Sequence, residues 1–176
     1  MPSGFILGIS NTNFGNLPSF AIEYAEWVEN TSLAVGIRQS LWVYPALEII
    51  HILGITLLVG AAFMFDLRLL GRSKDLPVLV LSGHLLPWSR RGLWLIIPSG
   101  LLLFSTNAKS LITDPTFGLK MALLLVASVN VLIFHRLILK RHSGDTTELP
   151  PTARVSAYVS ILVWISIIAC GRLLAY

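Results

Sequence analysis

Charged residues are scarce in this sequence: Asp, Glu, Lys and Arg make up 12% of its 176 residues, whereas apolar residues make up 55%. An ordinary soluble domain contains about 25% charged residues. The mean hydropathy of +0.76 is correspondingly high. This composition excludes a mainly water-exposed protein and indicates an integral membrane protein.

Cysteine is almost absent as well, since Cys170 is the single one. The chain therefore forms no internal disulfide and has no cysteine pair with zinc-finger spacing. Phosphate-binding loops, zinc-protease motifs and nucleophile elbows are also missing. No catalytic residue is assigned, and the enzyme class that stays open is a membrane oxidoreductase. Residues 1–15 lack the features of a signal peptide, so we expect the first apolar span to direct insertion.

Four apolar stretches are long enough to cross a bilayer, which takes about 20 residues of helix through about 30 Å of hydrocarbon. Lipid offers no partner to unpaired backbone groups, and the alternating pattern of a membrane barrel is missing. We therefore predict an all-α fold in which residues 1–176 form one membrane domain, a four-helix bundle with spans at 41–70, 85–107, 117–139 and 153–176.

An additional amphipathic helix is predicted at 17–36, before the first span. Phe20, Tyr24 and Trp27 lie on one side of this helix, and its glutamates lie largely on the other. We expect an interfacial helix at the outer membrane surface. Two roles stay open: a simple anchor, or a contact with a neighbouring subunit or with the outer mouth of the bundle.

The basic residues gather at the first and third connections between the spans. Nine of the 13 Lys and Arg residues flank these connections: Arg68, Arg72, Lys74, Arg90, Arg91, Arg136, Lys140, Arg141 and Arg154. The positive-inside rule then places both connections in the cytoplasm and both termini in the periplasm of a bacterial inner membrane. Because these charges border spans, we expect no nucleic acid partner.

The first span contains ionisable residues, which are costly inside a membrane and often mark a cofactor, ion or proton site. Glu48 and His51 are three residues apart on adjoining positions of one helix face. Asp66 follows Glu48 by five helical turns and projects from the same side. We expect Glu48 to support His51 or a metal, and Asp66 to pair with Arg68, Arg72 or a basic residue of another helix.

Histidines on facing helices predict a b-type haem, because neutral imidazole is a good axial ligand and porphyrin fits between apolar helices. His51 is the first predicted ligand and His135, in the third span, the second. Small residues such as Gly54 and Gly100 would let a helix or a flat cofactor approach closely. Lys120 is expected to snorkel to the surface or to bind haem propionates.

Two alternatives stay open. The first is a copper site built from Glu48 and His51 with Met121 or Cys170, since imidazole, carboxylate and sulfur all bind copper. His84 is a further candidate metal ligand, alone or with His135. The second alternative is a cofactor-free subunit of a membrane assembly, in which the polar stripe bonds neighbouring helices.

Several motifs together resemble those of an uncharacterised family of small bacterial four-helix membrane proteins. They are Glu48-x-x-His51-x-x-Gly54, Leu58-Val-Gly60, Asp66-Leu-Arg68-Leu-Leu-Gly71, Leu86-Pro-Trp88, the stretch 99–104, and Phe117-x-x-Lys120 leading to Asn130 and His135. We expect supporting polar roles for Lys120 and Asn130. More distantly, the chain is similar to copper-resistance D and HemJ-type membrane proteins, which implies haem or copper chemistry with His51 as a ligand.

The leading hypothesis is therefore a bacterial inner-membrane b-type haem protein that acts in electron transfer or redox sensing. We also expect a homo-oligomer, because four short spans bury little surface alone, and a redox partner.

Overall fold

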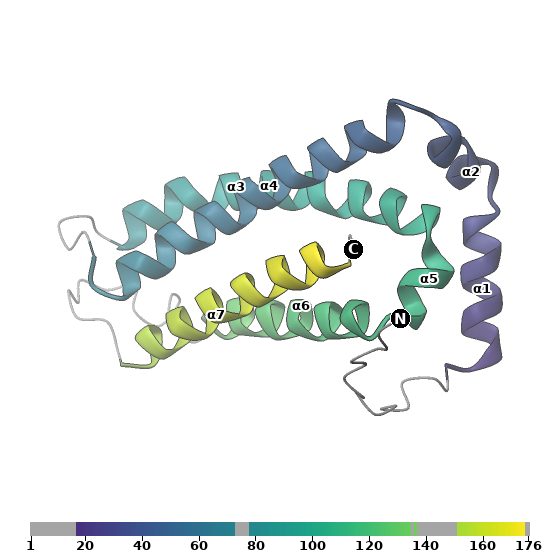
Figure 1. Ribbon diagram of the computed structural model, residues 1–176. Coiled ribbons are helices and arrows are strands. Elements are labelled where there is room, and N and C mark those ends of the chain that lie inside the picture. The colour runs from purple at the N-terminus through teal and green to yellow at the C-terminus, as the bar shows by residue number, and fades with distance from the viewer. Residues whose placement is uncertain (1–16, 73–77, 135, 137–150, 175–176) are drawn as a thin grey trace, which may run out of the picture.

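The computed structural model (Figure 1) describes residues 17–72, 78–134, 136 and 151–174. All regular structure in these residues is helical, which confirms the all-α prediction. The helices are α1 (Ser19–Glu29), α2 (Ser32–Gln39), α3 (Val43–Leu69), α4 (Val78–Thr106), α5 (Ala108–Thr113), α6 (Pro115–Ile133) and α7 (Pro151–Leu173).

Three of the described helices, α3, α6 and α7, are long and apolar enough to cross a membrane. They correspond to the first, third and fourth predicted spans. Large apolar side chains cover the outside of these helices, as a bilayer environment requires; examples are Ile49, Ile52, Leu125, Val131, Leu162 and Ile165. The part of the third span beyond residue 136 lies outside the described residues.

The second predicted span, 85–107, lies within α4, which is longer than predicted at 29 residues. Helix α4 is not among the helices with span-like composition, because Arg90 and Arg91 lower its hydropathy. A bundle of four membrane spans is therefore not confirmed.

The long helices form two pairs (Figure 1). Helix α4 runs back along α3, and α7 packs along α6 and also against α3. At one end of the molecule, the short helix α5 connects α4 to α6, and α1 runs across the ends of the long helices rather than along them. The order of elements thus places α3 and α4 on one side and α6 and α7 on the other.

Helices α3 and α4 approach each other at two glycines. A Cβ atom on Gly92 would lie 2.7 Å from both Gly54 O and Leu58 N, and one on Gly54 would lie 3.0 Å from Gly92 O. Because these neighbours are backbone atoms, only glycine fits at this crossing. The predicted close approach at Gly54 is present, whereas Gly60 has no such neighbour within 4 Å.

Arg90 and Arg91 directly precede this crossing and are exposed. Since Gly92 meets residues 54 and 58, the two arginines lie level with the middle of α3. Sequence reasoning expected them at the connection between α3 and α4 instead. The Arg91 guanidinium stacks over the ring of Trp88, 4.7 Å from its centroid, which gives this charge an aromatic neighbour.

Helices α6 and α7 pack through side chains. Ala127, Val163 and Ile167 form a buried cluster, and the amide of Asn130 bridges to Ser156 of α7. Helix α6 begins at a favourable cap, because the Asp114 carboxylate accepts a hydrogen bond of 2.7 Å from the backbone N–H of Thr116.

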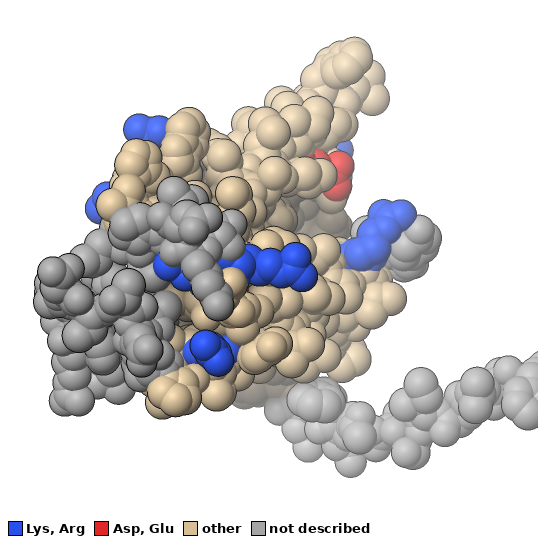
Figure 2. Space-filling model, turned by 90° about the vertical axis from the view of Figure 1, so that its left-hand side faces the viewer, with Lys and Arg blue, Asp and Glu red and all other residues tan. Residues whose placement is uncertain are grey.

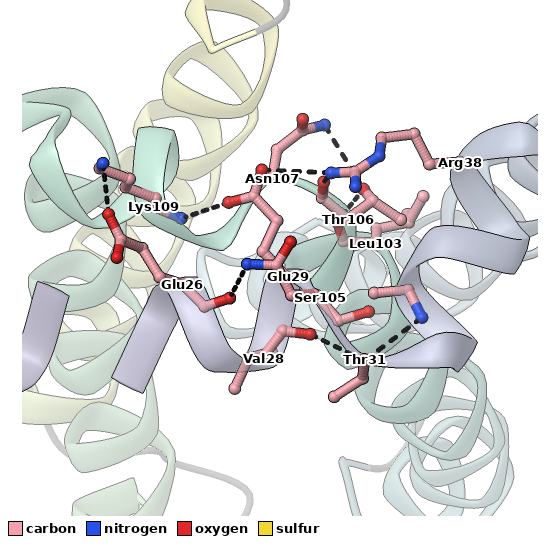
Figure 3. A network of polar contacts seen from close by, with 12 residues as sticks. Glu26, Val28, Glu29, Thr31, Arg38, Leu103, Ser105, Thr106, Asn107 and Lys109 are labelled. Atoms are coloured by element: carbon pink, nitrogen blue, oxygen red, sulfur yellow. Dashed lines mark hydrogen bonds and ion pairs between the residues drawn. The ribbon is translucent and has the colours of Figure 1, made fainter. Parts of the chain in front are cut away.

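The single helix predicted over 17–36 is two helices, α1 and α2. The break follows from polar side chains that bind the local backbone (Figure 3): Asn30 Nδ2 donates to Glu26 O, and Thr31 Oγ1 donates to Val28 O. Thr31 also caps α2 by accepting from Ala34 N–H. These hydrogen bonds satisfy groups at the helix ends and favour a turn over a continuous helix.

Candidate functional site

His51 lies on the face of α3 that meets α4 and is half-buried. Its Nδ1 atom is 2.9 Å from the Ser99 hydroxyl of α4. A Cβ atom on Gly100 would lie 3.0 Å from His51 Cε1, so glycine at this position lets the imidazole lie against the α4 backbone. Ser99 and Gly100, which are adjacent on α4, thus form a binding position for one imidazole ring.

The hydrogen bonds of Ser99 indicate which nitrogen of His51 carries the proton. Ser99 Oγ lies 2.5 Å from Leu95 O and 3.3 Å from Ile96 O, and its one hydrogen is donated to these carbonyls. Nδ1 of His51 must then donate to Ser99 Oγ, because the hydroxyl has no second hydrogen to give. We infer that Nε2 keeps its lone pair, which is the state that binds a metal.

Lys120 of α6 is a charged residue near this site, since it interacts electrostatically with His51 and with Cys170. Its Nζ atom would lie 3.7 Å from a Cβ atom placed on Gly171. Lys120 therefore lies against α7 while its charge acts across to α3. No acidic partner of Lys120 occurs among the contacts of the described residues.

Glu48 is exposed, and no hydrogen bond joins it to His51 among the described residues. Glu48 interacts with the Tyr44 hydroxyl, one turn earlier on α3. Its neighbour is thus a residue of its own helix.

His84 is distant from His51. It is exposed on α4, and its Nδ1 atom is 2.9 Å from Val80 O of the same helix. Fifteen residues separate His84 from Ser99, which corresponds to about 22 Å along the helix. The two histidines therefore belong to different parts of the molecule. His135 lies outside the described residues, and within the described residues no group of three or more His, Cys, Asp and Glu side chains could hold a metal.

Asp66 is buried near the end of α3, with 6% of its surface exposed. The hydroxyl of Ser160 on α7 donates a hydrogen bond to it. Sequence reasoning expected a basic partner and did not anticipate Ser160, because spacing along one helix does not reveal which residue of another helix faces it. Arg68, one of the expected partners, has interactions of its own.

A polar cluster at the α1 end of the molecule was not anticipated either (Figure 3). Lys109 Nζ pairs with Glu26, and Arg38 pairs with Glu29 at 3.2 Å and donates to Thr106 O at 3.0 Å. The hydrogen bond and charge of Glu26 raise the pKa of Lys109. Sequence reasoning had counted Lys109 and Arg38 only as charges beside the spans, although together they tie α1 to α5 and to the end of α4.

The described structure thus belongs to an all-helical protein with three helices suited to a lipid bilayer. Residues 24–176 match the model of the family of unknown function DUF6644, and the chain belongs to that family. No curated protein and no solved structure matches the chain. These comparisons do not connect it to copper-resistance D or HemJ-type proteins.

Proposed function

We propose that the protein binds a b-type haem in the membrane through His51 and acts in electron transfer or redox sensing. The observation that carries this proposal is the hydrogen-bond chain from His51 Nδ1 through Ser99 to Leu95 O. With Nδ1 donating in this series of hydrogen bonds, Nε2 is an unprotonated imidazole nitrogen on a helix suited to a membrane. A ligand held in one orientation by a second residue is typical of metal-binding histidines.

The neighbouring residues fit such a group. Gly100 keeps the imidazole close to α4, and the Lys120 ammonium supplies a positive charge that suits a propionate. We assign no second axial ligand: Phe134, which directly precedes the predicted ligand His135, packs on Phe65, about 21 Å along α3 from His51. When bound, the haem iron would supply one-electron chemistry, while Ser99 holds the imidazole in place and Lys120 binds the acidic edge of the porphyrin.

We propose that α4 is a fourth span and that the two helix pairs form a four-helix bundle in a bacterial inner membrane. Support comes from the course of α4 along α3, which is itself suited to span a bilayer. Figure 2 looks onto the end of the molecule opposite α1, where Lys and Arg side chains are prominent. Arg68, Arg72 and Arg154 lie near this end, which favours a cytoplasmic location for it and periplasmic termini.

We propose that α1 lies in the interface of the outer membrane surface. The side of α1 that carries Glu26 and Glu29 faces α5: Glu26 pairs with Lys109, and Glu29 accepts from the Lys109 backbone N–H and pairs with Arg38 of α2. Phe20, Tyr24 and Trp27 are between 63% and 71% exposed. Exposed aromatic side chains suit the headgroup region of a bilayer, where water also reaches the exposed Glu23 of the same helix.

A homo-oligomer is supported by Glu48, which is exposed beside the exposed apolar side chains Ile49 and Ile52 of α3. Charged groups on such a helix usually face protein rather than lipid. Contact with a second copy or with a redox partner would shield this carboxylate and its Tyr44 partner from lipid.

The test of the haem proposal is a visible spectrum of the full chain in mild detergent, before and after dithionite, with iron and copper analysis of the same sample. We expect iron and a Soret band that sharpens on reduction. His51→Ala should abolish the band, whereas His84→Ala, the matched control on α4, should leave it unchanged. Ser99→Ala should keep the band but weaken haem retention about 10-fold or more, since it removes only the positioning hydrogen bond.

An iron-free sample without a Soret band would overturn the haem proposal. Bound copper lost in His51→Ala would then support the copper alternative, and a metal-free oligomer would support a structural subunit. A Soret band that persists in His51→Ala would retain haem but reject His51 as its ligand.

A further inference from the structure

Asp66 is a second intramembrane polar site, separate from His51. The two residues are fifteen positions apart on α3, which corresponds to about 22 Å along the helix. Asp66 is 6% exposed and faces α7, where Ser160 is equally buried. Any property of this carboxyl group is therefore independent of haem binding at the other end of α3.

The carboxyl group of Asp66 interacts with the Ser160 hydroxyl. Its Oδ2 atom is buried and has no hydrogen-bond partner among the described residues. An ionised carboxylate would place part of its negative charge on Oδ2 without a donor, and this costs far more in an apolar medium than leaving a neutral group unpaired.

The elements around Asp66 supply few polar groups. Helix α7 brings Ser160, and its Arg154 is exposed about 9 Å further along that helix. Helix α6 brings Phe134, whose ring packs edge-on against Phe65 beside Asp66. Arg68 follows Asp66 on α3, and Arg72 lies just beyond the end of that helix.

We propose that Asp66 and Ser160 form a proton-binding site between α3 and α7. Asp66 carries the proton on Oδ2, and the other carboxyl oxygen accepts the hydrogen bond from Ser160. The ligand is a single proton exchanged with water, so the site gains or loses one positive charge and no other bond changes. A group of this kind suits a membrane protein that moves protons or senses them.

Infrared spectroscopy of the full chain in mild detergent tests the proposal. At neutral pH we expect the C=O stretch of a protonated carboxylic acid, shifted in D2O and missing in Asp66→Asn. Glu23→Gln, which changes an exposed acid of α1, is the matched control and should keep the band. Ser160→Ala should move the band to higher wavenumber, because the C=O group loses its hydrogen bond. A purely structural role of Ser160 would not produce this shift.

A hydrophobic carbodiimide gives an independent measurement, because it reacts with protonated carboxyl groups in apolar surroundings. Peptide mass spectrometry should locate the adduct at Asp66, and labelling should fall at alkaline pH. Thermal unfolding of Asp66→Asn should match that of the parent, since a neutral side chain of equal shape replaces a neutral acid. The proposal would be overturned if the C=O band of the protonated acid stayed in Asp66→Asn and the carbodiimide did not label Asp66. Asp66 would then be an ionised carboxylate.

Discussion

The two helix pairs, α3 with α4 and α6 with α7, pack through different kinds of contact. Helices α3 and α4 meet through backbone at Gly54 and Gly92 and exchange a polar contact between His51 and Ser99. Helices α6 and α7 meet through apolar side chains around Ile167. Lipid-exposed helices gain little from the hydrophobic effect on association, so both pairs depend on close contact and interhelical hydrogen bonds.

The two helix pairs should differ in their tolerance to substitution. A backbone contact has no flexible atoms that can move aside, whereas a side-chain cluster can partly repack. The first pair should therefore be sensitive to added atoms and the second to removed atoms. The same rigidity suits the first pair to hold an imidazole in one orientation.

The largest expected effect is at the α3–α4 crossing. Gly92→Ala would place a Cβ atom 2.7 Å from two backbone atoms of α3, and we expect a loss of about 3 kcal/mol in the free energy of unfolding. Thermal or denaturant unfolding in detergent measures this loss. Gly83→Ala, on the same helix with nothing within 4 Å, is the control. Equal stability of the two variants would contradict the contact between the helices.

A smaller effect is expected in the α6–α7 cluster. Ile167→Ala removes buried side-chain atoms and should cost about 2 kcal/mol, at the lower end for such truncations because the cluster is small. Ile168→Ala is the matched control, since that neighbour is 48% exposed. Comparable losses in both variants would show that the cluster does not hold the pair together.

The hydrogen bonds between α6 and α7 should contribute less again. Asn130 Nδ2 donates to Ser156 O at 3.1 Å, and Ser156 Oγ donates to Asn130 Oδ1 at 2.9 Å. A double-mutant cycle of Asn130→Ala and Ser156→Ala should give a coupling energy of about 0.6 kcal/mol. Ser128→Ala serves as control, because its hydroxyl binds only Leu124 O of its own helix. Additive effects of the two substitutions would show that the hydrogen bonds between Asn130 and Ser156 do not stabilise the α6–α7 pair.

The smallest effect is expected where α1 and α5 join the two pairs. Glu26 raises the pKa of Lys109, so this ion pair stabilises the fold below the ordinary pKa of lysine. Its contribution is lost as the pH rises through the raised value. Lys109→Ala should therefore lower the unfolding temperature slightly at neutral pH and not at strongly alkaline pH. A difference that persists in alkali or in high salt would indicate a contact other than the ion pair.

The sequence was a good guide to elements and a poor guide to partners. Apolar length alone predicted α3, α6 and α7, and the cost of ionisable groups in lipid singled out His51 and Asp66. The partners Ser99 and Ser160 were not predictable, because a helical period gives the face of a residue and not the residue opposite it.

Local hydrogen bonds explain the remaining differences. The break between α1 and α2 depends on Asn30 and Thr31 binding backbone groups within four residues, and hydrophobic periodicity does not report such competition. The short helix α5 carries Lys109, which sequence reasoning took only as a charge at a membrane border. Its contact with Glu26 joins residues 83 positions apart.

The position of Arg90 and Arg91 has a consequence for the surrounding lipid. It limits the uninterrupted uncharged surface of α4 to residues 92–106, about 22 Å of helix, and Glu48 and Asp66 limit that of α3 to residues 49–65, about 25 Å. Both lengths are shorter than the hydrocarbon core of a bilayer, which is about 30 Å thick. We expect the membrane to thin beside α4, so that the protein favours lipids with short acyl chains.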